Sequence, residues 1–450
     1  MQDLTEGPVA GHLVRMAIPI AVGMVFQTLY FLVDIYFVAQ LGDAAIAGLS
    51  ASGNVMYLVM ALTQILGVGT MALISHAAGR KDRDDANLVF NQSVGMAALC
   101  GLFTLVAGYT LGGFYLVALV ADAATLKEGL TYLHWFLPGL GLQFALVSTG
   151  AALRGTGIVK PTIVVQILSV GLNVLLAPML IRGWPVGYAM GVAGAGLATS
   201  ISVAFGVALM LWYYIRLERY VMFDLTLLAP RAVVWKRIMA IGLPPGGEFA
   251  LMFVYLAIIY WVLQDLGPEA QAGFGVGSRV MQAIFLPAMA VAFACAPVAG
   301  QNFGAGKFDR VRATFRVSAG ILSVLMLILT LLCRWRPEAL IAFFSQEPEV
   351  IAFGAGFLRI ISLNFVATGI VFTCAGVFQA LGNTLPSLVA SGTRIVTFAI
   401  PAVWLAGQPW FEARHLWYTS VLTIFLQAAM AWWLLHRRMA RLPVGEPAAA

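Results

Sequence analysis

Long apolar stretches alternate with short polar breaks along almost the whole chain. A helix needs about 20 apolar residues to cross a bilayer, and each stretch reaches that length. The pattern therefore predicts twelve membrane-spanning helices, over residues near 13–40, 45–75, 87–112, 128–151, 161–182, 191–215, 237–265, 270–299, 313–333, 350–378, 386–406 and 413–436.

Composition indicates that a lipid bilayer surrounds these helices. Hydrophobic residues make up 61% of the chain and charged residues only 10%, whereas a soluble domain carries roughly 25% charged residues. The net charge of +6 requires no nucleic acid as a partner, because cytoplasmic loops of membrane proteins collect Lys and Arg. The cysteines stand apart from one another, so neither a metal site nor a disulfide framework is indicated.

Basic residues are unevenly divided between the two sets of loops. With the N-terminus inside, the outer loops hold only Lys127, Arg182, Arg334, Arg336 and Arg414. Since short cytoplasmic loops are rich in Lys and Arg, both termini are expected in the cytoplasm. The inner loops and the tail hold Arg80, Lys81, Arg83, Arg154, Lys160, Arg216, Arg219, Arg231, Lys236, Arg237, Lys307, Arg310, Arg312, Arg316, Arg437, Arg438 and Arg441.

A shift of 225 residues, the separation of Pro19 and Pro244, superposes the two halves of the chain. One register holds from the first span of each half to the fifth. Each half has an even number of spans, so the repeats are parallel. Further matches are Leu41-Gly42 with Leu266-Gly267, Gly48 with Gly273, Val55-Met56 with Val280-Met281, Gly79 with Gly304, Asp84 with Asp309, Gly157 with Gly382, and Pro161 with Pro386.

The repeat predicts an all-α membrane protein with two parallel-repeat six-helix lobes around a central cavity. The N-terminal lobe is expected over residues 1–215 and the C-terminal lobe over 237–436. A cytoplasmic linker, 216–236, joins them, and 437–450 form a cytoplasmic tail.

Several segments in both halves resemble the multidrug and toxic compound extrusion (MATE) family of the MOP flippase superfamily. The resemblance covers about the whole chain and implies a secondary transporter, not an enzyme, in a bacterial inner membrane. A monomer is expected. The segments are Ile18-Pro19, Phe26-Gln-Thr-Leu-Tyr30, Val33-Asp34, Val38-Ala-Gln-Leu-Gly42, Leu153-Arg-Gly-Thr-Gly157 with Pro161, Gly191-Val-Ala-Gly-Ala-Gly-Leu-Ala-Thr199, and Gly300-Gln-Asn-Phe-Gly-Ala-Gly306.

Asp34 is the strongest candidate for chemistry. A charged group deep in a span costs several kcal/mol unless it is paired or faces water, so such residues are functional by default. Gln27, Tyr30 and Asp34 share one helix face. A carboxylate in low-dielectric surroundings can take up and release a proton. The structural alternative is an Asp that caps a broken helix or pairs with a fixed partner.

The resemblance extends this candidate to a cation site. In MATE proteins the matching aspartate works with an Asn and a second Asp in span five and a Thr in span six, which implies Asn173 and Thr199 here. The second Asp falls on Ala177. A sodium ion is bound by several oxygen ligands, whereas a proton needs one basic group. Because one carboxylate is missing, proton coupling is favoured and sodium coupling is the alternative. For Asn173 and Thr199 alone, ordinary interhelical hydrogen bonding is the simpler explanation.

The second half carries a different set of charges within its spans. Glu248 is a candidate second titratable site, although some relatives place this glutamate a turn later, where Met252 stands here. Arg279, Arg359 and Arg394 have no basic equivalent in the first half except His134, opposite Arg359. Arg279 is expected to pair with Glu248 or with helix-end carbonyls, and contact with an anionic substrate is the less favoured alternative.

Prolines and polar side chains suggest where the lobes move and what they enclose. Pro19 and Pro244 occupy equivalent positions and are interpreted as hinges, with a static bend as the alternative. Gln27, Tyr30 and Asn54 are candidate residues of the cavity wall.

Together these features predict an antiporter that exports small organic compounds, cationic or amphipathic, in exchange for H⁺ or Na⁺, with no other cofactor. The alternative is a flippase for lipid-linked precursors. ATP is not expected to bind, because Phe308 follows Phe303-Gly-Ala-Gly-Lys307 where a phosphate loop needs Ser or Thr.

The loop charges generate a test of topology. Reporter fusions after Arg83, Lys236 and Arg438 should read cytoplasmic, and those near Gly187 or Arg336 should read external. A cytoplasmic reading at Gly187 would contradict the arrangement of twelve spans.

Overall fold

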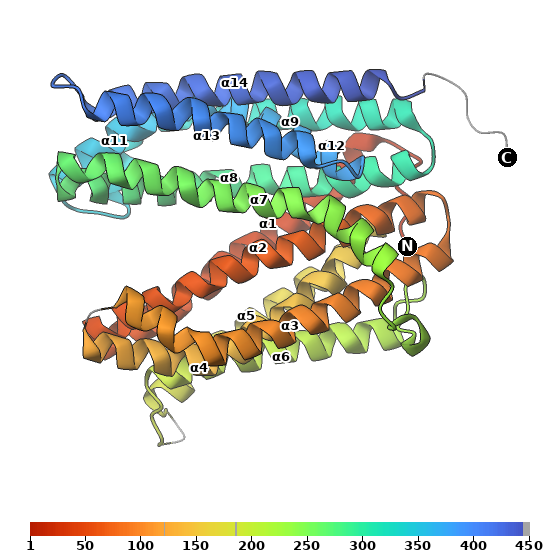
Figure 1. The fold of residues 1–450 in the computed structure, drawn as a ribbon, viewed down its shortest axis with the longest axis horizontal. Coiled ribbons are helices and arrows are strands. Elements are labelled where there is room, and N and C mark those ends of the chain that lie inside the picture. The colour runs from red at the N-terminus through yellow and green to blue at the C-terminus, as the bar shows by residue number, and fades with distance from the viewer. Residues whose placement is uncertain (121, 185–186, 444–450) are drawn as a thin grey trace. The chain divides into compact units, whose positions relative to one another are not determined.

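The computed structural model of the protein describes residues 1–120, 122–184 and 187–443, without the side chains of Tyr30, Phe31 and Asp34. Within these ranges every regular element is a helix (Figure 1). The α-helices are α1 Val9–Val38, α2 Asp43–Gly79, α3 Arg83–Leu119, α4 Ala123–Gly155, α5 Lys160–Arg182, α6 Val192–Arg216, α7 Ala232–Leu263, α8 Pro268–Gly304, α9 Phe308–Trp335, α10 Pro337–Ala342, α11 Pro348–Ile361, α12 Phe365–Ala380, α13 Leu385–Ala406 and α14 Ala413–Ala440. Short 3₁₀ turns lie at η1 Ala39–Leu41, η2 Leu225–Leu227, η3 Gln264–Leu266 and η4 Ser362–Asn364.

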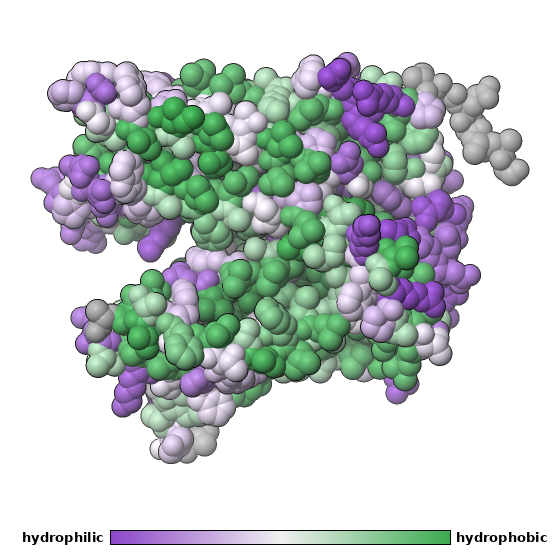
Figure 2. Space-filling view, in the orientation of Figure 1, coloured by the Kyte–Doolittle hydropathy of each residue, from purple (hydrophilic) through white to green (hydrophobic). Residues whose placement is uncertain are grey.

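The predicted spans are confirmed. Among the described residues, 12 helical segments are long and apolar enough to cross a membrane, and the tenth runs through α11, η4 and α12. Hydrophobic residues cover much of the surface along the middle of the helices, and hydrophilic residues gather toward the helix ends (Figure 2). Several helices continue past the apolar stretch that predicted them, because polar residues at their ends keep helical geometry.

The chain forms two compact units whose boundaries lie inside helices. Unit 1 contains Met1–Asp3 and Val22–Gly242, and unit 2 contains Leu4–Ala21 and Leu243–Ala450. Helices α1 and α7 therefore each pass from one unit to the other. This division differs from the predicted lobes, which began at residues 1 and 237, because hydropathy shows where a span lies and not what it packs against.

The two units share one packing scheme. In unit 1, α4 packs on α2, α3 and α6, and α5 packs on α6. In unit 2, α12 packs on α8, α9 and α14, and α13 packs on α14. A Cβ on Gly48 would lie 2.6 Å from the Gly129 nitrogen, and one on the equivalent Gly273 would lie 3.2 Å from that of Gly354. The same helix pairs thus approach closely through glycine in both units, as membrane helices favour.

The equivalent of α4 is broken in unit 2. Residues Ser362–Asn364 form a 3₁₀ turn between α11 and α12. A carbonyl freed from a helix inside a membrane needs another donor. At this break the Ser362 carbonyl oxygen accepts from the Phe365 backbone N–H, and the Thr330 hydroxyl also donates to it at 2.9 Å.

The start of α7 is fixed on α2 within unit 1. A Cβ on Gly69 would overlap the Ile238 carbonyl oxygen, and one on Gly242 would overlap that of Ile65. Either change would force these helices apart. Small residues at these positions thus permit a backbone-to-backbone contact.

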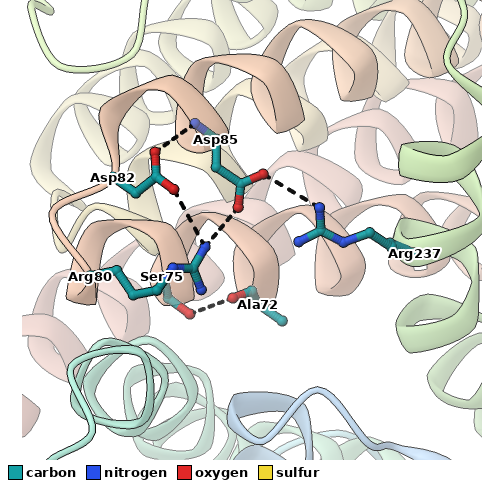
Figure 3. A network of polar contacts seen from close by, with 6 residues as sticks. All are labelled: Ala72, Ser75, Arg80, Asp82, Asp85 and Arg237. Atoms are coloured by element: carbon teal, nitrogen blue, oxygen red, sulfur yellow. Dashed lines mark hydrogen bonds and ion pairs between the residues drawn. The ribbon is translucent and has the colours of Figure 1, made fainter.

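An ionic network holds the same region at its polar end (Figure 3). The Asp85 carboxylate accepts from Arg80 at 2.8 Å and from Arg237 at 3.4 Å, while its backbone N–H donates to Asp82 at 3.0 Å. Exposed ion pairs each contribute little to stability. Because Asp85 of α3 contacts Arg80, directly after α2, and Arg237 of α7, the network mainly fixes the position of these helix ends.

Segments before α7 and α1 are docked by side-chain amides. In unit 1, Asn87 and Asn91 each pair with a backbone N–H and a carbonyl of the segment Tyr220–Asp224, and Gln92 pairs with Ala229 and Arg231 further along. The predicted linker is thus bound along unit 1. In unit 2, the backbone of Leu4 bonds to Gln301 and Asn302 at 3.0 and 3.1 Å.

The contact between α2 and α7 predicts opposite effects for two glycine substitutions in α2. Gly69→Ala should lower the thermal unfolding midpoint in detergent, since overpacking costs roughly 1–3 kcal/mol. Gly53→Ala is the control, because a Cβ there meets nothing within 4 Å. It should leave stability unchanged or raise it by up to about 1 kcal/mol. Equal midpoints for the two variants would contradict the close contact.

Candidate functional site

Helices α5 and α6 bring two predicted site residues together inside unit 1. The Asn173 amide donates to the Thr199 hydroxyl at 3.5 Å, and that hydroxyl donates to the Ala195 carbonyl oxygen at 3.1 Å. Asn173 is fully buried and Thr199 is 3% exposed. The pair therefore lies in the protein interior and away from lipid.

Two buried oxygens beside this pair have no hydrogen-bond partner among the described residues. They are Asn173 Oδ1 and Ser169 Oγ. Ser169 lies one helical turn before Asn173, so both project from the same face of α5. A buried acceptor without a partner is costly, roughly 1–3 kcal/mol. Both atoms are available to a cation, a water molecule or a proton donor.

Ser169 was not predicted as a site residue from the sequence. The only indication in the sequence is that Ser169 lies four residues before Asn173. A single serine in a span usually hydrogen-bonds to a backbone carbonyl of its own helix. Ala177, one turn beyond Asn173, is fully buried. The position that lacks the family carboxylate thus lies on the same interior face.

Other predicted residues of unit 1 are placed less completely. Asp34 and Tyr30 lie in α1, and their side chains are outside the described residues. Gln27 and Asn54 are exposed on α1 and α2. Polar side chains exposed within spans favour water over lipid, so the cavity-wall prediction stays open for these two residues.

Glu248 of α7 has a partner that sequence patterns did not indicate. Its carboxylate accepts a hydrogen bond from Ser387 of α13, and its Oε1 atom is buried with no partner among the described residues. No ion pair among those residues joins Glu248 to Arg279. Of the two partners expected for Arg279, Glu248 is therefore not observed, because neighbouring helices bring Ser387 and not the α8 arginine to the carboxylate, and contact with helix-end carbonyls stays a prediction. Arg279 is exposed.

Both predicted hinge prolines lie close to the boundaries between the units. Pro19 is inside α1, two residues before Ala21, where α1 leaves unit 2. Pro244 is inside α7, two residues after Gly242, where α7 leaves unit 1. Proline removes a helical hydrogen bond and weakens the helix locally. These are the points at which a bend would change the path of a helix between units.

A known family model matches the sequence of both halves of the chain. A family model, MatE, matches residues 19–179 and again residues 244–405. The chain belongs to the MatE family. Both matches begin at an equivalent proline, Pro19 or Pro244, so the family unit coincides with the predicted repeat. Its twelve spans are accordingly those of a multi-pass membrane transporter.

Relatives of known name extend over nearly the whole chain. The chain is 28% identical over 429 residues, 92% of its length and 90% of the relative's, to the probable multidrug resistance protein YpnP of Bacillus subtilis (strain 168). It is 24% identical over 409 residues, 88% of each chain, to the FAD transporter of Shewanella oneidensis. A MOP superfamily transporter from Pyrococcus furiosus has the same fold, with a TM-score of 0.90 over 98% of each chain at 22% identity.

The missing carboxylate predicts how the site would respond to sodium. Ala177→Asp should raise the thermal unfolding midpoint in sodium chloride relative to choline chloride, because a bound ion stabilises the folded state by mass action. The intact protein should show a smaller difference between the two salts. A variant destabilised equally in both would show that the added carboxylate binds no sodium.

Proposed function

We propose that this protein is a secondary active antiporter of a bacterial inner membrane, with both termini in the cytoplasm. It exports small organic compounds in exchange for protons, which bind at Asp34 beside Asn173 and Thr199. Family membership and the relative named as a probable multidrug resistance protein support efflux. The observation that carries the proposal is the pair of unpartnered oxygens, Asn173 Oδ1 and Ser169 Oγ, on the buried face of α5.

Contacts in unit 1 support the placement of Asp34 at this face. A Cβ on Gly23 of α1 would lie 3.4 Å from Ile163 of α5. The first and fifth spans run in the same direction. The same Cβ would lie 2.8 Å from Gln166, so eleven residues further along both helices the expected level of Asp34 falls between Val174 and Ala177 (34 minus 23, added to 163 and to 166).

The repeat gives the same register independently. Asp34 is equivalent to Ile259 of α7, and Asn173 is equivalent to Phe398 of α13. Ile259 and Phe398 belong to one buried cluster in unit 2. The ring of Tyr255, one turn before Ile259, lies 4.6 Å from that of Phe398. Equivalent backbone positions are thus neighbours where their side chains are described.

Protons are favoured over sodium because Ala177 supplies no oxygen. With one carboxylate, three amide or hydroxyl groups (Asn173, Thr199 and Ser169) and no second acid, the proposed site has fewer than the six or so oxygen ligands that a hard cation prefers, whereas a proton needs one. A proton that enters down a potential of 100 mV supplies about 2.3 kcal/mol. Export against a gradient draws on this energy if Asp34 binds the proton with different affinity in the two states.

Substitution of Asp34 tests the proposal. Efflux of a cationic dye from proteoliposomes should follow an imposed proton gradient, persist without sodium and collapse with a protonophore. Asp34→Asn should abolish this efflux, because the amide keeps the size of the side chain but cannot titrate. Glu248→Gln is the matched control in the other unit and should retain most of the activity.

The outcome separates the two carboxylates. Full efflux by Asp34→Asn together with loss in Glu248→Gln would move the coupling site to unit 2. Efflux by the intact protein that requires sodium and ignores the protonophore would reject proton coupling.

A further inference from the structure

Arg394 places a positive charge near the middle of a membrane span. It lies nine residues after the start of α13, Leu385–Ala406, which is about 14 Å along the helix. A charge at that depth costs several kcal/mol unless it is paired or faces water. The bilayer core is about 30 Å thick, so the headgroups are far from this guanidinium on either side.

The Arg394 side chain is held against an aromatic ring. Its guanidinium carbon lies 4.7 Å from the centroid of Tyr255 on α7. The Tyr255 hydroxyl is 2.7 Å from the hydroxyl of Ser420 on α14, to which the Asn364 amide donates at 3.2 Å. This chain of contacts fixes the ring, and the ring fixes the plane of the guanidinium.

No carboxylate neutralises Arg394 among the described residues. The ion pairs found there all lie elsewhere, and Glu248 is bonded to Ser387. Arg394 Nε is buried without a hydrogen-bond partner. Arg394 is half-buried, and cation–π contact offsets part of the cost of its charge, roughly 0.5–2 kcal/mol, but it leaves the buried Nε–H without an acceptor among the described residues. The Arg394 guanidinium is thus held by the Tyr255 ring, and its Nε–H lacks a hydrogen-bond acceptor in the described part of the chain.

Within the described part of unit 2, two side-chain amide oxygens without hydrogen-bond donors lie among the same helices. The Gln427 amide of α14 donates to Ser391, one turn before Arg394, at 3.1 Å. Gln427 Oε1 and Asn364 Oδ1 are buried with no partner among the described residues. Helices α7, α13 and α14 and the turn η4 therefore present a cation, an aromatic ring and two amide oxygens.

The repeat shows that the cation is specific to unit 2. Arg394 is equivalent to Ser169, the residue with the unpartnered hydroxyl beside Asn173. Position for position, the same helix face carries small neutral acceptors in unit 1 and a guanidinium in unit 2. A purely structural arginine would be expected to have its donors satisfied by the protein.

We propose that Arg394, stacked on Tyr255, binds a carboxylate or phosphate group of the transported compound. The compounds carried would then include zwitterionic or anionic aromatic molecules as well as cations. This inference rests on the proposed export function and specifies its substrate class. Planar guanidinium groups bind both anions through paired N–H donors, and the ring of Tyr255 offers a surface for an aromatic body.

A matched pair of dyes tests the proposal. Rhodamine B carries a free carboxylate, and rhodamine 6G carries an ester in its place. Their binding to the full-length protein in phosphatidylcholine nanodiscs is measured by fluorescence anisotropy. Arg394→Gln should weaken the binding of rhodamine B by about tenfold to a hundredfold, the range for loss of charge-assisted hydrogen bonds. Binding of rhodamine 6G should change less than twofold.

Two further variants separate binding from structure. Arg394→Lys keeps the charge without the planar fork and should restore part of the rhodamine B affinity. Arg359→Gln is the control, since Arg359 is exposed and paired with Glu338 at 2.6 Å, and it should bind both dyes as the intact protein does. Unchanged rhodamine B binding in Arg394→Gln would overturn the proposal. Equal loss of both dyes would assign Arg394 a structural role and overturn it as well.

The source of the anion and the export function are tested in the same system. If phosphatidylglycerol in the nanodisc displaces rhodamine B only when Arg394 is present, the site binds a lipid headgroup, and the inference about cargo fails. If the intact protein binds both dyes with Arg394-dependent selectivity but exports neither in proteoliposomes, the proposed function fails while the anion site stands.

Discussion

Hydrocarbon cannot hydrogen-bond to a peptide group, and this constraint governs the whole chain. Within the described residues each span is helical, because a helix satisfies its own backbone. Breaks in regular helical bonding do occur. At the turn after Ile361, the Ser362 carbonyl accepts from the Phe365 backbone N–H and also from the Thr330 hydroxyl. The interior prolines of α1 and α7 lie close to the points where these helices pass from one unit to the other, and further prolines lie inside α4, α5, α8 and α13.

Anchoring of these two helices follows from the same constraint at the water boundary. There, peptide groups outside helices can use side chains or water. Asn87, Asn91 and Gln92 hold the segment before α7 through paired amide contacts, and Gln301 with Asn302 holds the segment before α1. The start of each crossing helix is thus fixed within one unit, on the near side of the proline that is predicted to act as a hinge.

The hydrophobic pattern and the internal repeat made the fold predictable. They did not predict which side chains contact each other. Apolar length fixed the twelve spans, and one shift of 225 residues identified the two repeats that the family model later matched. Asn173 and Thr199 are hydrogen-bonded to each other, and their role in a cation site stays a prediction. Three features were not predictable from the sequence: the hydrogen-bond partner of Glu248, the boundaries between the units and the unpartnered hydroxyl of Ser169. They depend on the rotation and register of neighbouring helices. A hydropathy pattern records depth in the membrane but carries no information on which side chain faces which.

Two units with one packing scheme can therefore differ entirely in interior chemistry. Asp34 and Asn173 have Ile259 and Phe398 as their equivalents, so the acid and its amide in unit 1 become part of an apolar cluster in unit 2. One turn away, Ser169 becomes Arg394. Duplication supplies the same backbone twice, and substitution at the same helix face then places an acid in one unit, where we propose proton binding, and a cation in the other, where we propose anion binding. A ligand shifts a conformational equilibrium only through unequal affinity for its states, so under these two proposals the coupling ion and the cargo would each bind in a different unit without competing for one residue.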